Sequence, residues 1–372
     1  MLNPHSEDQL IEQPAIALLA EMGWETMDCF HEFEQAGGSP LDREHKGEVV
    51  LTRKLREALE KLNPNVSSEA IDLAIEELTR SRAVMGLVEA NREIYGLLKD
   101  GVKVTITDSD GDGETVEVLR VIDWTHPENN DFFLASQLWI AGEMYLRRPD
   151  LIGFINGLPL VLMEFKRIDE SIYSAYHDNV RDYKDTIPHL FWYNAFILLS
   201  NGSESKVGSL TASWEHFAEW KRISSEGEQG IVSLDTILRG VCDHRRLLDI
   251  IENFTLFMEV QGGLIKIFSK NHQYLGVNNT IEALRHIESN QGKLGVFWHT
   301  QGSGKSISMI FFAQKVLRKI AGNWTFVLVT DRTELDDQIY KNFASGSGVV
   351  AQKEVHAEDV KHLRQLLGED HR

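Results

Sequence analysis

Residues 149–166 read PDLIGFINGLPLVLMEFK, and this stretch decides the fold of the first part of the chain. Asn156-Gly157 favours a type I′ turn, because both central residues of that turn need positive φ. The turn predicts two antiparallel strands. Because side chains alternate faces along a strand, Glu164 and Lys166 share one side of the second strand, and the fold-back brings Asp150 across to them. The hairpin is therefore expected to place two carboxylates beside one amine.

Two carboxylates with a nearby amine suit metal-ion binding and hydrolysis. Carboxylate oxygens are hard ligands that bind Mg²⁺, an ion that keeps several waters and can also take a phosphate oxygen. Asp150 and Glu164 are the predicted metal ligands, and Lys166 can orient or deprotonate a water and offset phosphate charge. The set predicts metal-dependent hydrolysis of a phosphodiester.

A purely structural role for the same residues is the alternative. Asp150 could cap a strand, and Glu164 and Lys166 could be a solvated pair on an exposed face, since short motifs also match by chance. The neighbouring residues favour the site. Residues 160–163, LVLM, are typical of a strand covered on both faces, and this apolar run leads directly into the charged pair.

Composition and length bound the class of protein. With 372 residues, 42% of them hydrophobic, the chain is long enough for two domains with separate cores. Its two cysteines, Cys29 and Cys242, are too few and too far apart to indicate a disulfide framework or a zinc site. No basic leader opens the chain, and no apolar run approaches the ~18 residues that a membrane span needs. We expect a cytoplasmic protein without a membrane partner.

The charge is unevenly distributed along the chain. The net charge is −19, yet residues 262–372 carry 14 Lys and Arg against 11 Asp and Glu, so the acidic excess lies entirely in residues 1–261. Nucleic-acid-binding domains usually have a basic surface. We therefore expect the acidic first domain to hold DNA poorly on its own and to receive it from other domains or subunits.

Hydrophobic periodicity predicts the elements around the hairpin. Capping signals and apolar spacing indicate three helices before the hairpin and two after it, and alternation indicates a second β-hairpin and a later strand, which together predict a mixed α/β sheet. A connector follows, with a boundary at Gly262-Gly263. The predicted helices cover residues 6–22, 49–62, 67–78, 172–184 and 247–251, and the predicted strands cover residues 102–107, 116–121 and 193–200.

The turn at residues 108–113, DSDGDG, imitates the start of a calcium-binding EF-hand loop. Position twelve of such a loop should be a bidentate glutamate, and here it is Leu119. The flanking residues are also predicted strands instead of helices. We therefore interpret the segment as a solvated hairpin turn.

A second site is predicted at residues 299–306, HTQGSGKS. The small residues Gly302, Ser303 and Gly304 let backbone N–H groups close round an anion at a helix N-terminus. Lys305 supplies a charge for the β- and γ-phosphates of ATP, and Ser306 can bind Mg²⁺. The first position of the usual phosphate-binding loop is glycine, and here it is His299. A buried strand at 293–298, a helix at 307–317 and a parallel strand at 325–330 supply the expected βαβ context.

Together, the Asp150…Glu164-x-Lys166 hairpin, the HTQGSGKS loop and residues 329–338, VTDRTELDDQ, resemble the restriction (R) subunit of type I restriction endonucleases over nearly the whole chain. The resemblance implies a PD-(D/E)xK nuclease domain at 1–262 and the start of a RecA-like, superfamily 2 helicase-like motor at 263–372.

The resemblance also implies residue roles, cofactors and partners. Asp150 and Glu164 hold Mg²⁺, Lys166 serves the attacking water, and Gln273 reads the adenine of ATP. The partners are double-stranded DNA and the methylase and specificity subunits. Three further sets belong to the resemblance: Asp331-Arg332, which faces DNA; Asn179 and Tyr183, where the family often has Gln-x₃-Tyr; and Glu7 or Glu12 as an upstream acidic residue.

The motor motifs are incomplete within these 372 residues. Such motors need an Asp-Glu pair on a later strand and an arginine finger. Glu369-Asp370-His371 is interpreted as a solvated tail, because a helical pattern at 363–367 precedes it. We therefore expect a truncated chain that does not translocate DNA. Two alternatives remain: a nuclease-helicase of DNA repair or phage defence, and an inactive remnant that retains only DNA or subunit contacts.

Overall fold

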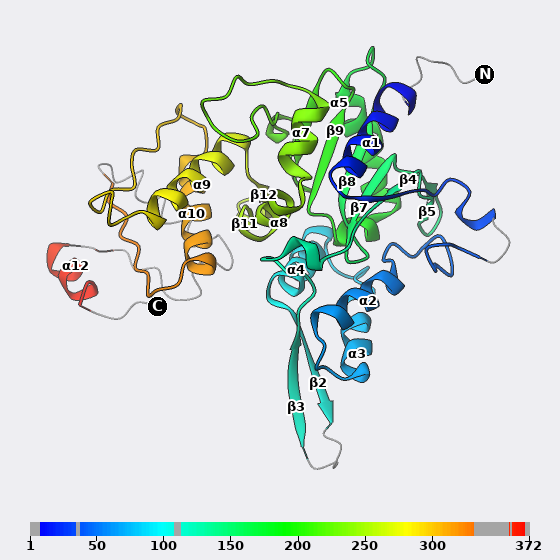
Figure 1. Ribbon diagram of the computed structural model, residues 1–372, viewed down its shortest axis with the longest axis horizontal. Coiled ribbons are helices and arrows are strands. Elements are labelled where there is room, and N and C mark those ends of the chain that lie inside the picture. Colours follow the sequence, from blue (N-terminus) through cyan, green and yellow to red (C-terminus); the bar gives the residue numbers. More distant parts are fainter. Residues whose placement is uncertain (1–7, 35–37, 108–112, 331–356, 358, 369–372) are drawn as a thin grey trace. The chain divides into compact units, whose positions relative to one another are not determined.

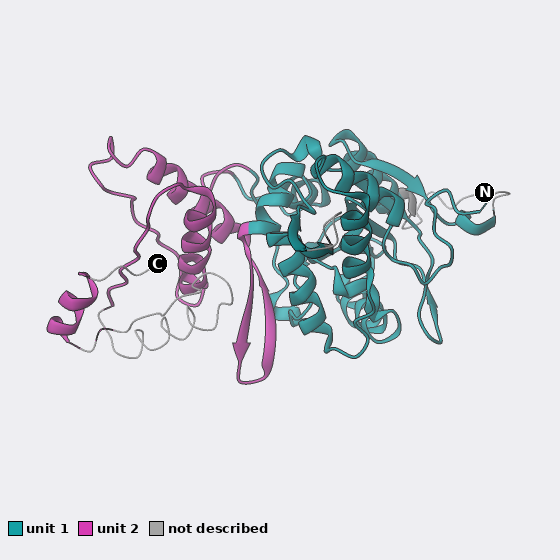
Figure 2. Cartoon of the chain, turned by 90° about the horizontal axis from the view of Figure 1, so that it is seen from below, with its two compact units in different colours: residues 1–223, 229–252 teal, residues 224–228, 253–372 magenta. Residues whose placement is uncertain are grey.

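The computed structural model describes residues 8–34, 38–107, 113–330, 357 and 359–368 (Figure 1). The chain forms two compact units, which Figure 2 shows in different colours. Unit 1 comprises residues 1–223 and 229–252, and unit 2 comprises residues 224–228 and 253–372. No helix in the described ranges is long and apolar enough to cross a membrane.

A six-stranded mixed sheet forms the centre of unit 1. Its order is β1-β4-β7-β8-β9-β10, with β1 and β4 parallel, β8 and β9 parallel, and the other neighbours antiparallel. The strands β4, β7, β8 and β9 are buried along their whole length, as their apolar runs predict. The bounds are β1 Glu25–Asp28, β4 Phe132–Ser136, β7 Leu151–Ile155, β8 Leu158–Phe165, β9 Phe196–Ser200 and β10 Ser205–Gly208.

The predicted hairpin of residues 150–166 is confirmed as β7 and β8. Ile155 pairs with Leu158 across a two-residue turn, and Asn156 and Gly157 have φ of 51° and 78°. The Asn156 side chain also ties the turn to its surroundings, because its Oδ1 accepts from the N–H of Asp131 at 2.7 Å and its Nδ2 donates to Val121 O at 2.7 Å. The sequence signal and the tertiary contacts therefore specify the same turn.

Replacing Gly157 with alanine is expected to destabilise unit 1 by about 1–3 kcal/mol, the cost of a strained backbone conformation. The residue has positive φ, and an added Cβ would lie 2.4 Å from Leu51 O and 2.8 Å from Leu55 N. Urea unfolding followed by circular dichroism measures the change. Gly262→Ala is the control, because nothing lies within 4 Å of a Cβ there. Equal stability of the two variants would contradict the role assigned to the turn.

Helices and two small antiparallel sheets complete unit 1, in which α1 packs on α7 (Figure 1). The helices are α1 Gln13–Glu21, α2 Thr52–Leu62, α3 Ser68–Thr79, α4 Leu87–Asp100, α5 Ile172–Ser174, α6 Arg181–Thr186, α7 Leu234–Val241 and α8 His244–Asn253. The π-helices are η1 Asp8–Glu12 and η4 Ala175–Val180, and the 3-10 helices are η2 Glu32–Glu34, η3 Pro127–Asn129, η5 Pro188–Trp192 and η6 Trp214–His216. The small sheets pair β2 Val102–Thr107 with β3 Glu114–Leu119 and β5 Ile140–Ala141 with β6 Leu146–Arg147.

Most of these elements match the sequence predictions, with shifted ends. The helix predicted from residue 49 begins at Thr52, and the strand predicted from 193 begins at Phe196, because the 3-10 helix η5 precedes it. The helix predicted at 172–184 is interrupted by η4. The connector contains regular structure that the sequence pattern did not reveal, including β10 and α7. The turn at 108–112 and the capping residue Ser6 lie outside the described residues.

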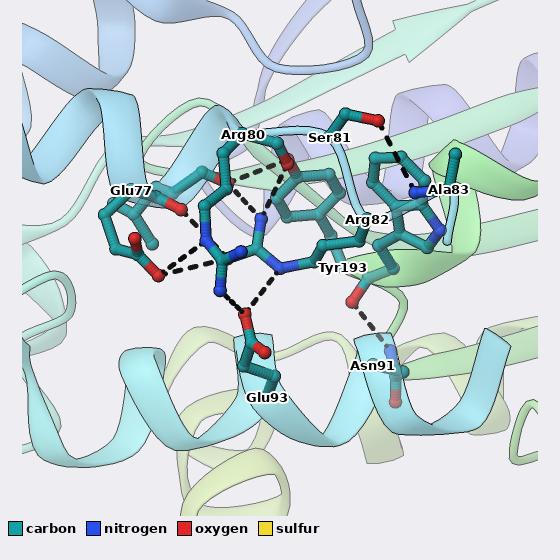
Figure 3. Close-up of polar contacts among 10 residues, drawn as sticks. Glu77, Arg80, Ser81, Arg82, Ala83, Asn91, Glu93 and Tyr193 are labelled. Atoms are coloured by element: carbon teal, nitrogen blue, oxygen red, sulfur yellow. Dashed lines mark hydrogen bonds and ion pairs between the residues drawn. The ribbon is translucent and has the colours of Figure 1, made fainter. Parts of the chain in front are cut away.

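The link between α3 and α4 is held by a buried arginine (Figure 3). Arg82 is completely buried, and its Nε donates to Glu93 Oε1 at 2.9 Å. Its other nitrogens donate to the carbonyl oxygens of Leu78, Arg80 and Glu77. A buried guanidinium needs such partners. Arg82 is therefore satisfied within the fold, and we assign it a structural role.

Unit 2 contains an antiparallel hairpin and three helices within its described residues. Gln261 and Gly262 form the turn of the hairpin, and Gly263 begins its second strand. The elements are β11 Thr255–Val260, β12 Gly263–Phe268, α9 Asn271–Arg285, α10 Lys305–Lys319 and α12 Val360–Leu366. The predicted helix after the phosphate-binding loop is confirmed as α10, and the helical pattern near 363–367 is confirmed as α12.

The two strands predicted beside α10 are wrong. Residues 293–300 and 323–330 carry no strand hydrogen bonding, and Val296, Trp298 and Val329 are largely exposed. An apolar run indicates only that its side chains favour burial. A strand also needs a neighbouring strand whose backbone groups hydrogen-bond with its own. Neither segment has that neighbour in the described ranges. Parts of both segments line a mostly apolar cavity of about 350 Å³ along α10, with Phe297 and Phe326 among its walls.

Candidate active site and nucleotide loop

The structure brings Asp150, Glu164 and Lys166 together at one end of the β7–β8 hairpin. Asp150 immediately precedes β7, and Glu164 is the second-to-last residue of β8. The backbone N–H of Phe165 donates to Asp150 Oδ2 at 2.8 Å. Lys166 follows β8, and its positive charge opposes the rise in pKa that burial causes at both carboxyls. The amine therefore lies within electrostatic reach of the acidic pair.

Burial dominates the electrostatics of the pair. Burial raises the pKa of Glu164 well above its ordinary value, and the negative charge of Asp150 raises it further. Burial also raises the pKa of Asp150, against the opposing effects of the Phe165 N–H and Lys166. These two neighbouring carboxylates repel each other when both are ionised, because the charge of Asp150 acts on the buried Glu164. A bound cation would remove that repulsion.

One carboxylate oxygen of Glu164 accepts hydrogen bonds, and the other has no hydrogen-bond partner. Asn179 Nδ2 donates to Glu164 Oε1 at 2.5 Å, and the Tyr183 hydroxyl donates to the same oxygen at 3.1 Å. Glu164 Oε2 is buried without a hydrogen-bond partner. A buried oxygen without a partner lowers the stability of the fold by about 1–3 kcal/mol, so a bound ligand or a proton on this oxygen would be stabilising. The Asn179 and Tyr183 pair, predicted only by resemblance, lies where it can orient this carboxylate.

Gln137 belongs to the site, and sequence reasoning missed it. Its backbone N–H donates to Asp150 O and its Nε2 donates to the buried Glu12, each at 2.9 Å. Its side chain also opposes the rise in the pKa of Asp150 that burial causes. Gln137 also has φ of 54°, a strained conformation of the kind that clusters at functional sites. Of the two upstream acids considered from sequence, Glu12 is thus linked to the pair through Gln137, and Glu7 lies outside the described residues.

The donor set suits a cation that keeps water. Within the described ranges, no group of three or more His, Cys, Asp or Glu side chains could hold a metal ion. Two carboxylates, one with an unpartnered buried oxygen, still fit Mg²⁺, which commonly binds one or two protein carboxylates and keeps several waters. Asp150 and Glu164 are the side chains that could hold it.

The predicted nucleotide loop begins at His299 and leads into α10. Gly302 and Gly304 have positive φ, 78° and 85°, which glycine adopts without steric cost. The Lys305 amine donates to the carbonyl oxygens of His299 at 2.8 Å and Thr300 at 3.0 Å. The lysine thus lies back over its own loop.

Gln273 and His299 fix the loop from two sides. Gln273 Nε2 donates to Gly304 O at 3.0 Å, so this predicted adenine-reading residue contacts the loop itself. His299 Nε2 lies 3.2 Å from Glu226 Oε1. Ser303 and Ser306 lie in the loop and in the first turn of α10. Asp331 and Arg332 lie outside the described residues.

Comparison with known proteins identifies the family. The family model for the type I restriction enzyme R protein N terminus matches residues 4–216, more than half of the chain. The chain belongs to this family. A second model, for SWI2/SNF2 ATPases, matches residues 272–372, the part that contains the nucleotide loop. The R-protein match covers the acidic pair, and the ATPase match covers Gln273 and Lys305.

Individual relatives of this R-protein family agree with the models. The chain is 37% identical to a protein of Haemophilus influenzae named type I restriction enzyme HindI endonuclease subunit, over 97% of the chain and 35% of that relative. It is 28% identical to a putative type I restriction enzyme endonuclease subunit, MjaIXP, of Methanocaldococcus jannaschii, over 97% of the chain and 36% of that relative. The chain therefore spans about a third of the length of these relatives.

Proposed function

We propose that the chain is the nuclease and nucleotide-binding portion of the restriction subunit of a type I restriction–modification enzyme. In the complete subunit, the proposed activity is Mg²⁺-dependent cleavage of DNA coupled to ATP-driven translocation of the DNA. The observation that carries the nuclease assignment is the acidic pair Asp150 and Glu164, in which Glu164 is buried and its Oε2 has no hydrogen-bond partner. Membership of the R-protein family supports the reaction class.

The proposed mechanism divides the work among the site residues. Mg²⁺ supplies Lewis-acid polarisation of the scissile phosphate when it is bound by Asp150 and Glu164. Asn179 and Tyr183 orient the Glu164 carboxylate through Oε1, and Gln137 orients Asp150. Lys166 positions the attacking water and offsets the negative charge of the phosphate. We assign residues 1–262 to a PD-(D/E)xK nuclease domain, and this division of roles supports the assignment.

We assign residues 263–372 to a RecA-like ATP-binding domain. Gly302, Ser303 and Gly304 present backbone N–H groups to the phosphates of ATP, Lys305 binds the β- and γ-phosphates, and Ser306 binds the accompanying Mg²⁺. The match to SWI2/SNF2 ATPases supports this role. We propose that Gln273 contacts the adenine, next to the loop that it already touches through Gly304.

The proposed partners are double-stranded DNA and the methylase and specificity subunits of a type I complex, in the cytoplasm. The acidic excess of residues 1–261 supports the need for partners, since an acidic surface repels the DNA backbone. A cleavage assay with the complete subunit, purified together with its partners, tests the function. We expect Mg²⁺- and ATP-dependent linearisation of a plasmid that carries unmethylated recognition sites. Failure to cut under those conditions would refute the proposal.

Cation binding is expected to release a proton. The raised pKa of Glu164 means that this carboxyl keeps its proton at a pH above 4.5, where an ordinary glutamate has lost it. The cation must displace that proton, so affinity for Mn²⁺ increases as pH rises through the raised pKa and falls as pH is lowered. Titration calorimetry in buffers of different ionisation enthalpy measures the release. Glu164→Gln should abolish it, and pH-independent Mn²⁺ binding would contradict the prediction.

A further inference from the structure

Arg148 lies two residues before Asp150, in the segment that joins β6 to β7. This segment leads directly into the end of the hairpin that carries the acidic pair. Burial raises the pKa of Asp150, and the positive charge of Arg148 opposes that rise. The adjacent Arg147 is used differently, since it forms a bidentate ion pair with Asp182. Two consecutive arginines next to the site therefore have different surroundings.

Two aromatic rings hold the Arg148 guanidinium. Its Cζ lies 4.8 Å from the ring centroid of Phe30 and 5.0 Å from that of Trp139. The two rings are 6.0 Å apart, and Trp139 Nε1 donates to the carbonyl oxygen of Phe30 at 3.2 Å. Cation–π contacts with both rings limit the movement of the guanidinium plane. The group is thus held in place before any ligand binds.

The guanidinium N–H groups of Arg148 are available to donate hydrogen bonds to a ligand. Across the ranges that the structure describes, its guanidinium makes neither a hydrogen bond nor an ion pair, and the side chain is half-buried. Arg43 and Arg82, which are buried, instead donate to carboxylates and backbone carbonyls. Arg148 therefore presents a planar set of donors whose strongest partners would be the oxygens of an anion.

We propose that Arg148 binds a backbone phosphate of the DNA, next to the phosphate that is cleaved. The inference rests on the proposed nuclease function and adds a substrate-binding residue to it. An acidic pair repels the DNA backbone, so a fixed cation beside it favours docking of the strand. Arginine binds phosphate in a bidentate manner, which fixes orientation as well as adding attraction. Phe30 and Trp139 act as positioning residues, because they hold the guanidinium and touch no phosphate in this proposal.

The test uses the complete subunit with its partners and a short DNA duplex as the probe. Binding is measured without divalent cation over a range of salt concentrations. Arg148→Met keeps an apolar stem between the rings and removes the charge. We expect the slope of log K against log salt to fall in magnitude by about 0.9, the value of one lost phosphate contact. We also expect kcat/KM for cleavage to fall about tenfold, as misplacement of a substrate can do.

Arg53→Met is the matched control. Arg53 is an exposed residue of α2 that pairs with Glu57 at 3.8 Å. The start of α2 lies against the turn of the hairpin, since Leu51 N–H donates to Gly157 O, and the acidic pair lies at the other end. This variant should keep the wild-type slope and rate. Arg148→Lys should keep the slope and lose part of the cleavage rate, because its charge remains but the planar donors are gone.

The outcomes separate this inference from the proposed function. If the wild-type complex does not cleave DNA, the proposed function itself is wrong. If the wild type cleaves and Arg148→Met keeps both the salt slope and the rate, Arg148 does not bind phosphate. A lower rate with an unchanged slope and a lowered melting temperature indicates a structural role and also overturns the inference. Should Arg148→Met fail to fold, Arg148→Gln provides the same comparison of slopes.

Discussion

Replacing Asp150 with asparagine is expected to abolish DNA cleavage by the complete enzyme while ATP hydrolysis continues at the wild-type rate. The substitution keeps the size of the side chain and its hydrogen bond from the Phe165 N–H, but it removes the charge that binds the cation. A catalytic metal contributes several kcal/mol, so the loss should be roughly 10³-fold or more. Plasmid linearisation and phosphate release, measured in the same samples, give the two rates.

The control for this variant is Asp169→Asn. Asp169 follows Lys166 by three residues, is exposed, and pairs with Arg167 at 3.1 Å. A single surface pair of this kind contributes little to stability, so the control should cleave DNA like the wild type. If the Asp150→Asn variant cleaved DNA at the wild-type rate, the acidic pair would have no part in the mechanism.

Replacing Lys305 with alanine is expected to have the complementary effect. The amine lies over the loop backbone at His299 and Thr300, where the β- and γ-phosphates of ATP would take the place of the carbonyl contacts. Loss of this charge should reduce ATP hydrolysis by at least about a hundredfold, the typical cost of removing one electrostatic stabiliser of a transition state. Cleavage that depends on translocation should be lost with it.

Mn²⁺ binding at the acidic pair should persist in the Lys305→Ala variant, because the two predicted sites use separate residues. Lys293→Ala, a change at an exposed lysine upstream of the loop, is the control for general loss of charge. It should hydrolyse ATP normally. ATP hydrolysis at the wild-type rate in Lys305→Ala would show that HTQGSGKS is not the nucleotide loop.

The hairpin that carries the acidic pair could be predicted from sequence because its signals are local. Asn156-Gly157 specifies the turn, and an irregularity between Gly153 and Phe154 shifts the pairing by one residue. This shift, which the sequence pattern does not reveal, sets Asp150 level with Glu164. Asn179 in η4 and Tyr183 in α6 are indicated only by the resemblance to the family, and both contact Glu164 Oε1 in the structure. Local pattern and tertiary structure agree at the turn of the hairpin.

Gln137 could not be predicted, because nothing in its own sequence neighbourhood marks it. Its role depends on long-range contacts with Asp150 and Glu12, and on a positive φ that side chains other than glycine rarely adopt. The helix α4 was missed for a different reason. Its apolar residues are interleaved with polar ones, and Asn91 is buried where it donates to three backbone carbonyls.

The strand predictions near the nucleotide loop failed for a general reason. Residues 293–298 and 325–330 have the composition of buried strands, and composition reports a preference for burial alone. Strand formation also requires hydrogen-bonding neighbours, which depend on the rest of the fold. The helix α10 needed no such neighbour for its backbone, and its prediction from the same stretch was confirmed.

The most direct test of the nuclease assignment is the position of a divalent cation. A crystal of the protein soaked in manganese, measured at a wavelength where manganese scatters anomalously, locates the ion without reference to activity. We predict an anomalous peak bound by a carboxylate oxygen of Asp150 and by Glu164 Oε2, the oxygen that has no partner in the present structure. Manganese bound elsewhere, with these two carboxylates free of it, would contradict the account.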